Sequence, residues 1–453
     1  MPLERTDDAY RCPPLVVLAD DLSGAVECAA ALPRCQSVDL DPGTPGPAGA
    51  TRVLDLDSRR GSAPAAARIV ARAVRVHETD GALLVKKADS TLRGNFAPEA
   101  AAFADGAGGI LVVPALPALG RTVRDGVVRL HGVPLHLTGA WKAEPEAPPR
   151  SVGEALGTLR TAVVPLEEVR AGAPHLERRL RSGLAAGTSL VCDAETDADL
   201  DALAAVLLRL PRTVRTIGSG GIVGALGRRS VAGCGRSDPG PPEPGVPRRV
   251  VVVVGTAHPG AAAQIAQLTA RGAQHIALSA DALLAHPSGE QQSVPDAEDR
   301  TRLGTVRCAR APLRQTGAGT VRHRYPVTVF SIDSTGTIDA SAAPRLVHAL
   351  CRAVVGGLPQ DADLVLTGGE TARTLLNALA VTTLLPVREV HHGAVLCRTP
   401  AGRGVVTRPG SFGGPDSLVR MVEALRPDTT RHTHGGTTDP IAAGIHNPSD
   451  GGP

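Results

Sequence analysis

Short apolar runs alternate along the chain with longer stretches of helical periodicity. In the first half, helical patterns such as 65–77 and 200–210 separate apolar runs at 15–18, 53–56, 82–85, 110–113, 190–192 and 214–217. The second half repeats this alternation, with apolar runs at 250–254 and 364–366 and a last helix expected from about 415 to 425. Strands alternating with helices of about 10–15 residues are typical of parallel sheets. We therefore predict an α/β fold of two domains, each a mostly parallel sheet flanked by helices.

A Pro/Gly-rich stretch at 232–249 interrupts the alternation and predicts a linker between the two domains. The polar, Arg-rich segment 286–324 predicts a long surface excursion of the second domain. The expected division is therefore a flexible N-terminus at 1–12, a first domain at 13–231, the linker, a second domain at 250–426 and a disordered tail at 427–453.

Composition and charge exclude several classes of partner. Aromatic residues make up only 2% of the chain and the net charge is +3, so neither a base-stacking platform nor a basic stripe for nucleic acid is expected. No apolar run approaches the roughly 20 residues of a membrane helix, and the N-terminus lacks the pattern of a secretory signal. The eight Cys show no metal-ligand spacing. We expect a cytoplasmic protein that binds small molecules, and a homo-oligomer is left open.

Two adjacent carboxylates, Asp20 and Asp21, lie between the first strand and the first helix. Ligands of open α/β sheets bind at the carboxyl ends of strands, so a carboxylate here is placed to orient or deprotonate a substrate hydroxyl. The alternative is that one of the two simply caps the helix. Both are candidate catalytic residues, and the sequence does not decide which is the base.

A cation-rich loop, KKADSTLRGN at 86–95, follows the strand at 82–85. Arg suits a carboxylate as a bidentate fork, and Lys suits it as a mobile point charge. By itself this loop also fits a solvated charged surface. Together with the acidic pair it predicts a site for a small substrate that has both a hydroxyl and a carboxylate. The candidate substrate-binding residues are Lys86, Lys87, Asp89, Ser90, Arg93 and, from the loop at 114–125, Arg121.

Three loops of the second half contain glycine and connect a strand to a helix, at 255–258, 367–371 and 409–414. Glycine lets the backbone approach phosphate oxygens, and the start of a helix favours anions. The chain has no GxxxxGK[ST] sequence, which excludes a P-loop enzyme, and no GxGxxG after the first strand, which disfavours a dehydrogenase. The candidate nucleotide-binding residues are Thr256, His258, Gly368, Gly369, Glu370, Thr371 and Gly410.

Five segments, in order, resemble those of the four-carbon acid sugar kinase family: ADDLSGA, KKADSTLRGN, PALPALGRTVRDGV, TGGETA and PGSFGGPD. The resemblance implies an N-terminal domain that binds a sugar acid, a C-terminal domain that binds ATP, and an active site in the cleft between them. It implies phosphorylation of the terminal hydroxyl of threonate, erythronate or an oxo derivative, with Mg²⁺ as cofactor through ligands that the sequence does not identify.

The resemblance places Asp20, Asp21, Lys87, Asp89, Ser90 and Arg93 at the sugar acid, and Gly368, Gly369, Glu370, Thr371 and Gly410 at the nucleotide. Two segments depart from the family pattern. Gly255-Thr256-Ala257-His258 replaces a serine-rich loop, and Thr407-Arg408-Pro409-Gly410 stands where Lys-Ser-Gly is typical. A catalytically silent sugar-acid sensor that has lost the use of ATP is therefore the alternative.

Overall fold

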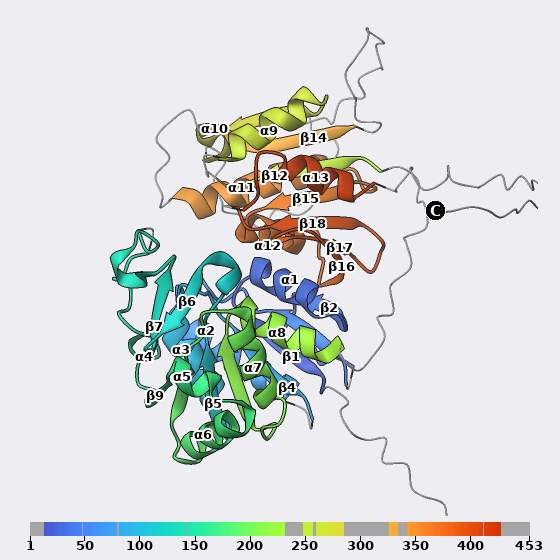
Figure 1. Ribbon diagram of the computed structural model, residues 1–453. Helices are drawn as coiled ribbons and strands as arrows, with labels where there is room; N and C mark the ends of the chain where they lie inside the picture. Colours follow the sequence, from blue (N-terminus) through green and yellow to red (C-terminus); the bar gives the residue numbers. More distant parts are fainter. Residues whose placement is uncertain are drawn as a thin grey trace, which may run out of the picture.

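The computed structural model describes residues 13–426 except 48, 79–80, 143, 232–247, 257–259, 285–325, 334–341 and 411. We call 13–231 the N-terminal half and 248–426 the C-terminal half. Both termini, nearly all of the predicted linker and the predicted surface excursion lie outside the described residues. The two halves are stacked one above the other (Figure 1).

One sheet of 15 strands runs through both halves. Every strand pair in it is parallel except those formed by β16 and β17. The strands of the N-terminal half, in spatial order, are β2 (Cys35–Asp39), β3 (Thr51–Asp55), β1 (Leu15–Ala19), β4 (Leu83–Lys87), β11 (Val214–Gly218), β5 (Gly109–Val113), β10 (Ser189–Cys192) and β9 (Thr161–Val164). Those of the C-terminal half are β13 (Gln274–Ser279), β14 (Val327–Asp333), β12 (Val250–Val254), β15 (Asp363–Thr367), β18 (Gly404–Arg408), β17 (Ala394–Arg398) and β16 (Thr383–His391).

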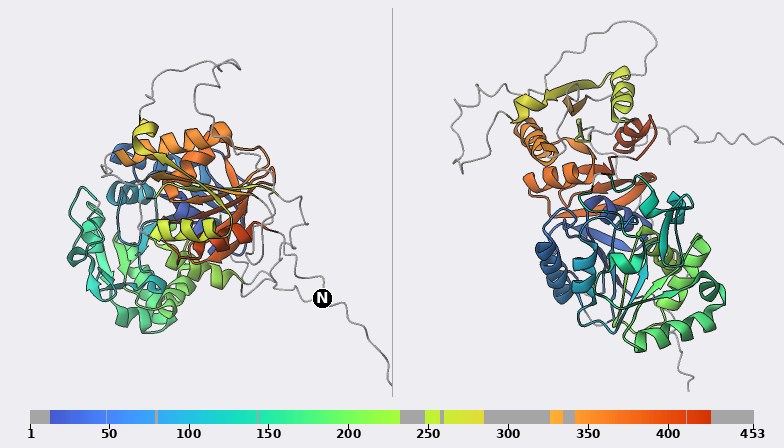
Figure 2. Two further views of the ribbon diagram at one scale, coloured as in Figure 1. Left: turned by 90° about the horizontal axis from the view of Figure 1, so that it is seen from above. Right: turned by 90° about the vertical axis from the view of Figure 1, so that its left-hand side faces the viewer.

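Helices cover both faces of this sheet (Figure 2). In the N-terminal half, α2 (Ala63–His77) packs beside α3 (Phe96–Ala104), and the opposite face is covered by α1 (Leu22–Ala31), α6 (Ala173–Ala185), α7 (Asp197–Leu207) and α8 (Gly220–Val231). In the C-terminal half, α9 (Gly260–Ala270) packs beside α13 (Ser417–Ala424), and α10 (Ala280–Leu284), α11 (Ala343–Gly357) and α12 (Gly369–Ala378) form the other group. No described helix is both long and apolar enough to cross a membrane.

A small three-stranded antiparallel sheet extends from the N-terminal half. It consists of β6 (Arg121–Arg124), β7 (Val127–Leu130) and β8 (Val133–Pro134). The short helices α4 (Val152–Ala155) and α5 (Leu166–Arg170) and the 3₁₀ turns η1 (Pro117–Leu119) and η2 (Leu135–Leu137) complete the described elements. The apolar runs had not indicated this insertion, because its strands are short and mostly half-buried.

The halves are joined more closely than two separate sheets would be. β16 of the C-terminal half pairs antiparallel with β2 of the N-terminal half, Thr383 opposite Asp39 and Leu384 opposite Val38. Leu384 is fully buried, and it belongs to a hydrophobic core cluster that includes residues of both halves. The two-domain α/β architecture is confirmed, and its two predicted sheets form one continuous sheet.

Each half has a point where the chain leaves two neighbouring parallel strands in opposite directions. In the N-terminal half, β1 leads through α1 towards β2, whereas its neighbour β4 leads through α3 towards β5. In the C-terminal half, β12 leads through α9 towards β13, whereas its neighbour β15 leads through α12 towards β16. Crevices at such switch points are the usual ligand sites of open α/β sheets. Four of the loops singled out in the sequence follow these four strands, and the loops at 114–125 and 409–414 follow β5 and β18.

Candidate functional site

The carboxylates that follow β1 are held by an arginine that the sequence analysis missed. Arg59 bonds Asp20 through Nε (2.7 Å) and Nη2 (3.0 Å), and bonds Asp21 through Nη1 and Nη2, both at 3.0 Å. Its Nη2 also lies 3.9 Å from Oδ1 of Asp89. Arg59 therefore brings the acidic pair and the carboxylate of the cation-rich loop into one cluster.

The two aspartates of the pair differ in environment. Asp20 is buried; burial raises its pKa, but the charges of Arg59, Lys86 and Lys87 outweigh burial and hold the pKa below its usual value. Asp21 is half-buried and is the N-cap of α1, accepting a hydrogen bond from the backbone N–H of Gly24 at 3.1 Å. The capping interpretation is thus correct for Asp21, whose two oxygens are also bonded by Arg59.

Lys86 and Lys87 are adjacent in β4 but have different surroundings. Lys86 forms an ion pair with Glu99 of α3 at 2.8 Å and donates to the carbonyl of Lys87, so its ammonium is committed within the fold. Lys87 approaches the start of α1: a Cβ on Gly24 would lie 2.6 Å from its Nζ. Burial lowers the pKa of Lys87, but the nearby Asp20 and Asp21 outweigh burial and raise it, so Lys87 is a cation.

The ammonium of Lys87 is influenced by the nearby Asp20 and Asp21, but no described residue is its direct bonding partner. Lys87 is 5% exposed, yet among the described residues no acceptor forms a hydrogen bond or ion pair with its ammonium. A buried cation without a hydrogen-bond partner is costly, and an anionic ligand would relieve that cost. The charges of both predicted lysines act on Asp20, but of the two only Lys87 is left to contact a ligand, because Lys86 is paired with Glu99.

Arg93 and Arg121 differ in the partners that their guanidinium groups already have. Arg93 forms a bidentate pair with Asp89, through Nε at 2.9 Å and Nη2 at 3.0 Å. Burial opposes the ionisation of Asp89, but the hydrogen bonds from Arg93 and the charge of Arg59 hold its pKa far below its usual value. Arg121, at the start of β6, donates to the hydroxyl of Ser90 and forms no ion pair within the described part of the chain. Its guanidinium is the more available fork for a ligand carboxylate.

Three glycine loops of the C-terminal half lie at the ends of neighbouring parallel strands, β12, β15 and β18. A Cβ on Gly410 would lie 2.7 Å from Oγ1 of Thr256, and a Cβ on Gly255 would lie 2.1 Å from Oγ1 of Thr371. The loops therefore touch, and their glycines permit the contact. Thr371 is buried against Gly255, which gives it a packing role, and His258 lies outside the described residues.

The start of α12 faces the acidic pair of the N-terminal half. A Cβ on Gly369 would lie 2.8 Å from Oγ of Ser23 and 3.5 Å from Oδ2 of Asp21. Gly368, the N-cap of α12, has a φ of 91°, a conformation that favours glycine. Glu370 forms an ion pair across the halves with Arg60 at 2.6 Å. The TGGE loop thus lies beside the N-terminal cluster, and Glu370 is committed to that contact.

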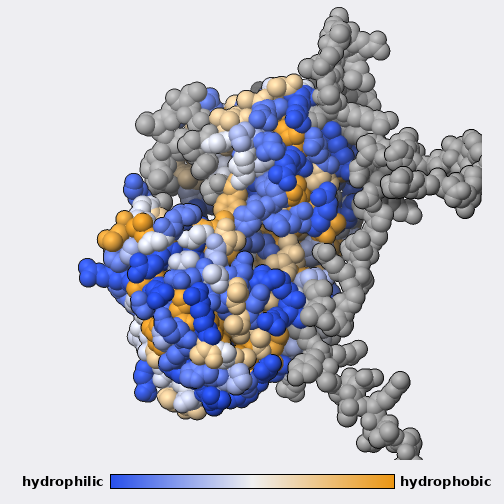
Figure 3. Space-filling model, viewed as in Figure 1, coloured by the Kyte–Doolittle hydropathy of each residue, from blue (hydrophilic) through white to orange (hydrophobic). Residues whose placement is uncertain are grey.

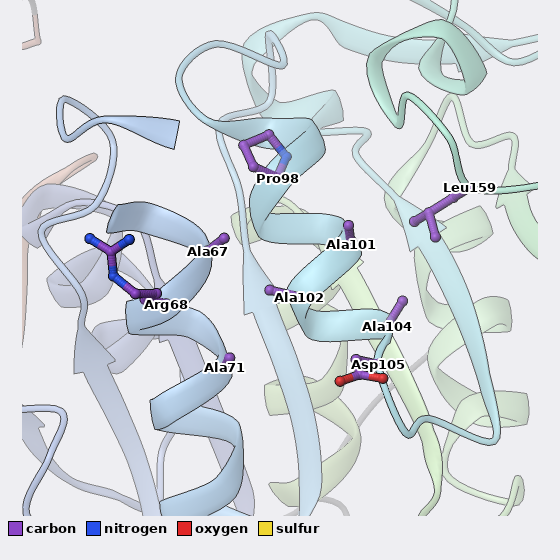
Figure 4. Close-up of a pocket in the computed structure, with 9 residues that line it drawn as sticks. All are labelled: Ala67, Arg68, Ala71, Pro98, Ala101, Ala102, Ala104, Asp105 and Leu159. Atoms are coloured by element: carbon purple, nitrogen blue, oxygen red, sulfur yellow. The ribbon is translucent and has the colours of Figure 1, made fainter. Parts of the chain in front are cut away.

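A cavity of about 400 Å³ lies between the halves, close to these loops. Leu119, two residues before Arg121, lines it from the N-terminal half, and Phe412, Gly413 and Ser417 line it from the C-terminal half. A larger hollow of about 740 Å³ lies between α2 and α3 and is lined mostly by alanines (Figure 4). None of the candidate site residues lines either hollow, so neither cavity by itself identifies the site.

Comparisons with known proteins agree with this arrangement. Residues 15–226 match a model described as the sugar-binding N-terminal domain, and 251–418 match the nucleotide-binding C-terminal domain. The chain is 33% identical over 427 residues to a D-threonate kinase of Cupriavidus necator, covering 90% of this chain and 97% of that one. It is 28% identical to a 3-oxo-tetronate kinase of Methylobacterium radiotolerans, covering 74% of this chain and 79% of that one.

A solved structure shares the fold. A crystal structure from Salmonella typhimurium LT2, provisionally described as a tRNA synthase, matches with a TM-score of 0.67 at 21% identity, over 90% of this chain and 98% of that one. At this identity the likeness shows only the fold. The family follows from the two domain matches and the Cupriavidus relative: the chain belongs to the four-carbon acid sugar kinase family.

Proposed function

We propose that this protein is an ATP-dependent kinase that phosphorylates the terminal hydroxyl of a four-carbon sugar acid, with D-threonate as the first substrate to test. The observation that carries the proposal is the contact of the glycine start of α12, at Gly369, with Ser23 and Asp21. It sets an anion-favouring helix start against a cluster suited to a hydroxy acid. D-threonate comes first because the Cupriavidus relative bears that name.

The N-terminal cluster supplies separate partners for the two ends of such an acid. Arg121 and Lys87 are the cations of this cluster that no carboxylate of the described residues contacts directly, and they would take the substrate carboxylate. Asp21 is the better candidate for the hydroxyl. Arg59 bonds both oxygens of each aspartate, but the side chain of Asp20 is buried, whereas Asp21 is half-buried and faces the start of α12.

The C-terminal half would hold the phosphates through backbone N–H groups of its three glycine loops. Phosphoryl transfer depends mostly on positioning and charge neutralisation, which fits a site built from loops on one side and cations on the other. Within the described ranges no cluster of His, Cys, Asp or Glu is arranged to hold a metal ion. We therefore assign Mg²⁺ chiefly to the nucleotide phosphates, where it would neutralise charge.

The test is an ADP-release assay with D-threonate, L-threonate, D-erythronate and 3-oxo-tetronate, followed by mass measurement of the product. Acid-dependent ADP release with a product heavier by one phosphoryl group supports the proposal. The sensor alternative predicts that the protein binds an acid while calorimetry detects no ATP binding. ADP release that is independent of every acid contradicts both.

A further inference from the structure

We infer that Arg59 is the positioning residue of this site, holding the carboxylate of Asp21 in the orientation in which it meets the substrate hydroxyl. The inference rests on the proposed function and adds a residue to it. Arg59 lies in the segment LDSRRG that follows β3, outside every motif on which the resemblance rests. Its side chain reaches the cluster from the strand next to β1.

Four hydrogen bonds to protein carboxylates occupy most of the head group of Arg59. Nε and Nη2 hold both oxygens of Asp20, and the second Nη2–H and one Nη1–H hold both oxygens of Asp21. Bidentate arginine–carboxylate pairs fix orientation as well as charge. An arginine used in this way has no fork left for the carboxylate of a substrate, so its effect on the reaction passes through Asp21.

The backbone of Arg59 is anchored to both loops of the site. Its N–H and that of Ser58 donate to the carbonyl of Asp20, at 3.2 and 3.0 Å. On the other side, Nδ2 of Asn95 lies 2.8 Å from the carbonyl oxygens of Ser58 and Gly61 and 3.4 Å from that of Arg59. The last residue of KKADSTLRGN therefore holds the Arg59 loop in place.

Gly94, also in that motif, leaves room for the stem of the arginine. A Cβ on Gly94 would lie 2.8 Å from Cγ of Arg59, and the φ of Gly94 is 81°. Both the space and the backbone conformation therefore call for glycine. Gly94 and Asn95, the end of the motif, thus contact the Arg59 loop. These contacts explain how Arg59, which is distant in sequence from Asp20 and Asp21, is held beside them.

The test compares three variants with the wild-type enzyme in the ADP-release assay. Arg59→Ala removes the charge and the fork, Arg59→Lys keeps the charge without the fork, and Arg170→Lys is the matched control. Arg170 forms a similar bidentate pair with Asp199, at 2.7 and 2.9 Å, in the same half but outside the site. Melting temperature and the folded fraction are measured for each variant.

We expect kcat of Arg59→Ala to fall on the order of 100-fold, the scale of a misplaced reacting group, with unchanged ATP affinity. The acid limb of its pH profile, which we assign to the buried Asp20 beside the proposed base Asp21, moves to higher pH, because Asp20 loses the largest charge that lowers its pKa. Arg59→Lys keeps the position of the limb and recovers part of kcat. Arg170→Lys keeps kcat and the pH profile.

Two results would overturn the inference. One is a wild-type kcat and pH profile, per folded molecule, in both Arg59 variants. The other is an equal loss of kcat in Arg170→Lys, which would make the effect one of general stability. If the wild-type protein phosphorylates no four-carbon acid, the proposed function fails first and the inference fails with it; an active wild type with active Arg59 variants removes the inference alone.

Discussion

The two halves use the same topological device with opposite chemistry. At the switch point of the N-terminal half, carboxylates and cations are packed into a mostly buried network around Arg59. At that of the C-terminal half, the loops touch through glycines, and Glu370 pairs with Arg60 of the other half. A small acid offers few atoms and needs side chains to identify it, whereas phosphate oxygens can be bound by backbone N–H groups alone.

This contrast predicts that the loss of one charge lowers activity more in the N-terminal site than in the C-terminal site. We expect the largest effect from Asp21→Asn. Asparagine still caps α1 but cannot accept a proton, so kcat should fall by about 10²- to 10⁴-fold. ADP release gives kcat, and acid binding can be followed by the fluorescence of Trp141, the only tryptophan, whose indole N–H donates to the carbonyl of Thr91. Asp41→Asn, in an exposed turn of the same half, is the control. An active Asp21→Asn enzyme would exclude Asp21 as the base.

The next effect separates the two arginines of the substrate loops. Arg121→Ala should raise KM for the acid by about 10- to 100-fold, because it removes a charged hydrogen-bond donor that no carboxylate of the described residues occupies. Arg93→Ala should raise KM less, since Arg93 is already bound to Asp89. Steady-state kinetics at saturating ATP measures both. A larger effect at Arg93 would return the substrate carboxylate to that residue, as the sequence had suggested.

The sequence predicts the elements better than their side-chain roles. Apolar runs such as 250–254 are strands because parallel strands are buried on both faces. The same periodicity held an unused signal: neighbours in a strand point to opposite faces, which argues against the prediction that Lys86 and Lys87 both bind the substrate. The sequence contained a weaker signal for Arg59. This residue follows β3, and β3 ends at the same edge of the sheet as β1, which the acidic pair follows.

Long-range pairing was beyond the sequence. The contact between β16 and β2 joins residues more than 340 positions apart, and nothing in either segment specifies the other. Gly369 shows the same limit. A glycine at the start of a helix predicted space for a phosphate group, whereas in the structure Ser23 of the other half lies beside this glycine. A valine there is now expected to disturb the contact between the halves as well as ATP binding.

In the C-terminal half, a smaller effect is expected from a change of backbone space at Gly410. A Cβ on Gly410 would lie 2.7 Å from Oγ1 of Thr256, so Gly410→Val should force the loops apart and raise KM for ATP by about 10-fold. Calorimetry with ATP and Trp141 fluorescence with the acid separate the two sites. Gly356→Val is the control, because Gly356 is exposed and nothing lies within 4 Å of its added Cβ. Equal losses of ATP and acid binding would mean that the halves do not bind separately.

The smallest effect concerns the stability of the join between the halves. Asp55 at the end of β3 is fully buried and pairs with Arg373 of α12 at 3.1 Å. Burial raises the pKa of Asp55 to about 7, and the charge of Arg373 offsets this only in part. The folded protein therefore binds more protons at this group than the unfolded chain between about pH 4 and 7. In that window Asp55 lowers stability as pH rises, by at most about 1.4 kcal/mol per pH unit.

Asp55→Asn removes the titrating group while keeping its size, so the contribution of Asp55 to this fall in stability should disappear. Urea unfolding of the wild type and the variant at pH 5, 6 and 7 measures the difference in slope, which is more informative than the difference in absolute stability. Arg373 also donates to the carbonyl of Leu40 at 2.7 Å, so its guanidinium keeps a partner across the halves in the variant. Identical pH slopes would show that Asp55 is ionised throughout this range, and that the join is held by an ordinary ion pair.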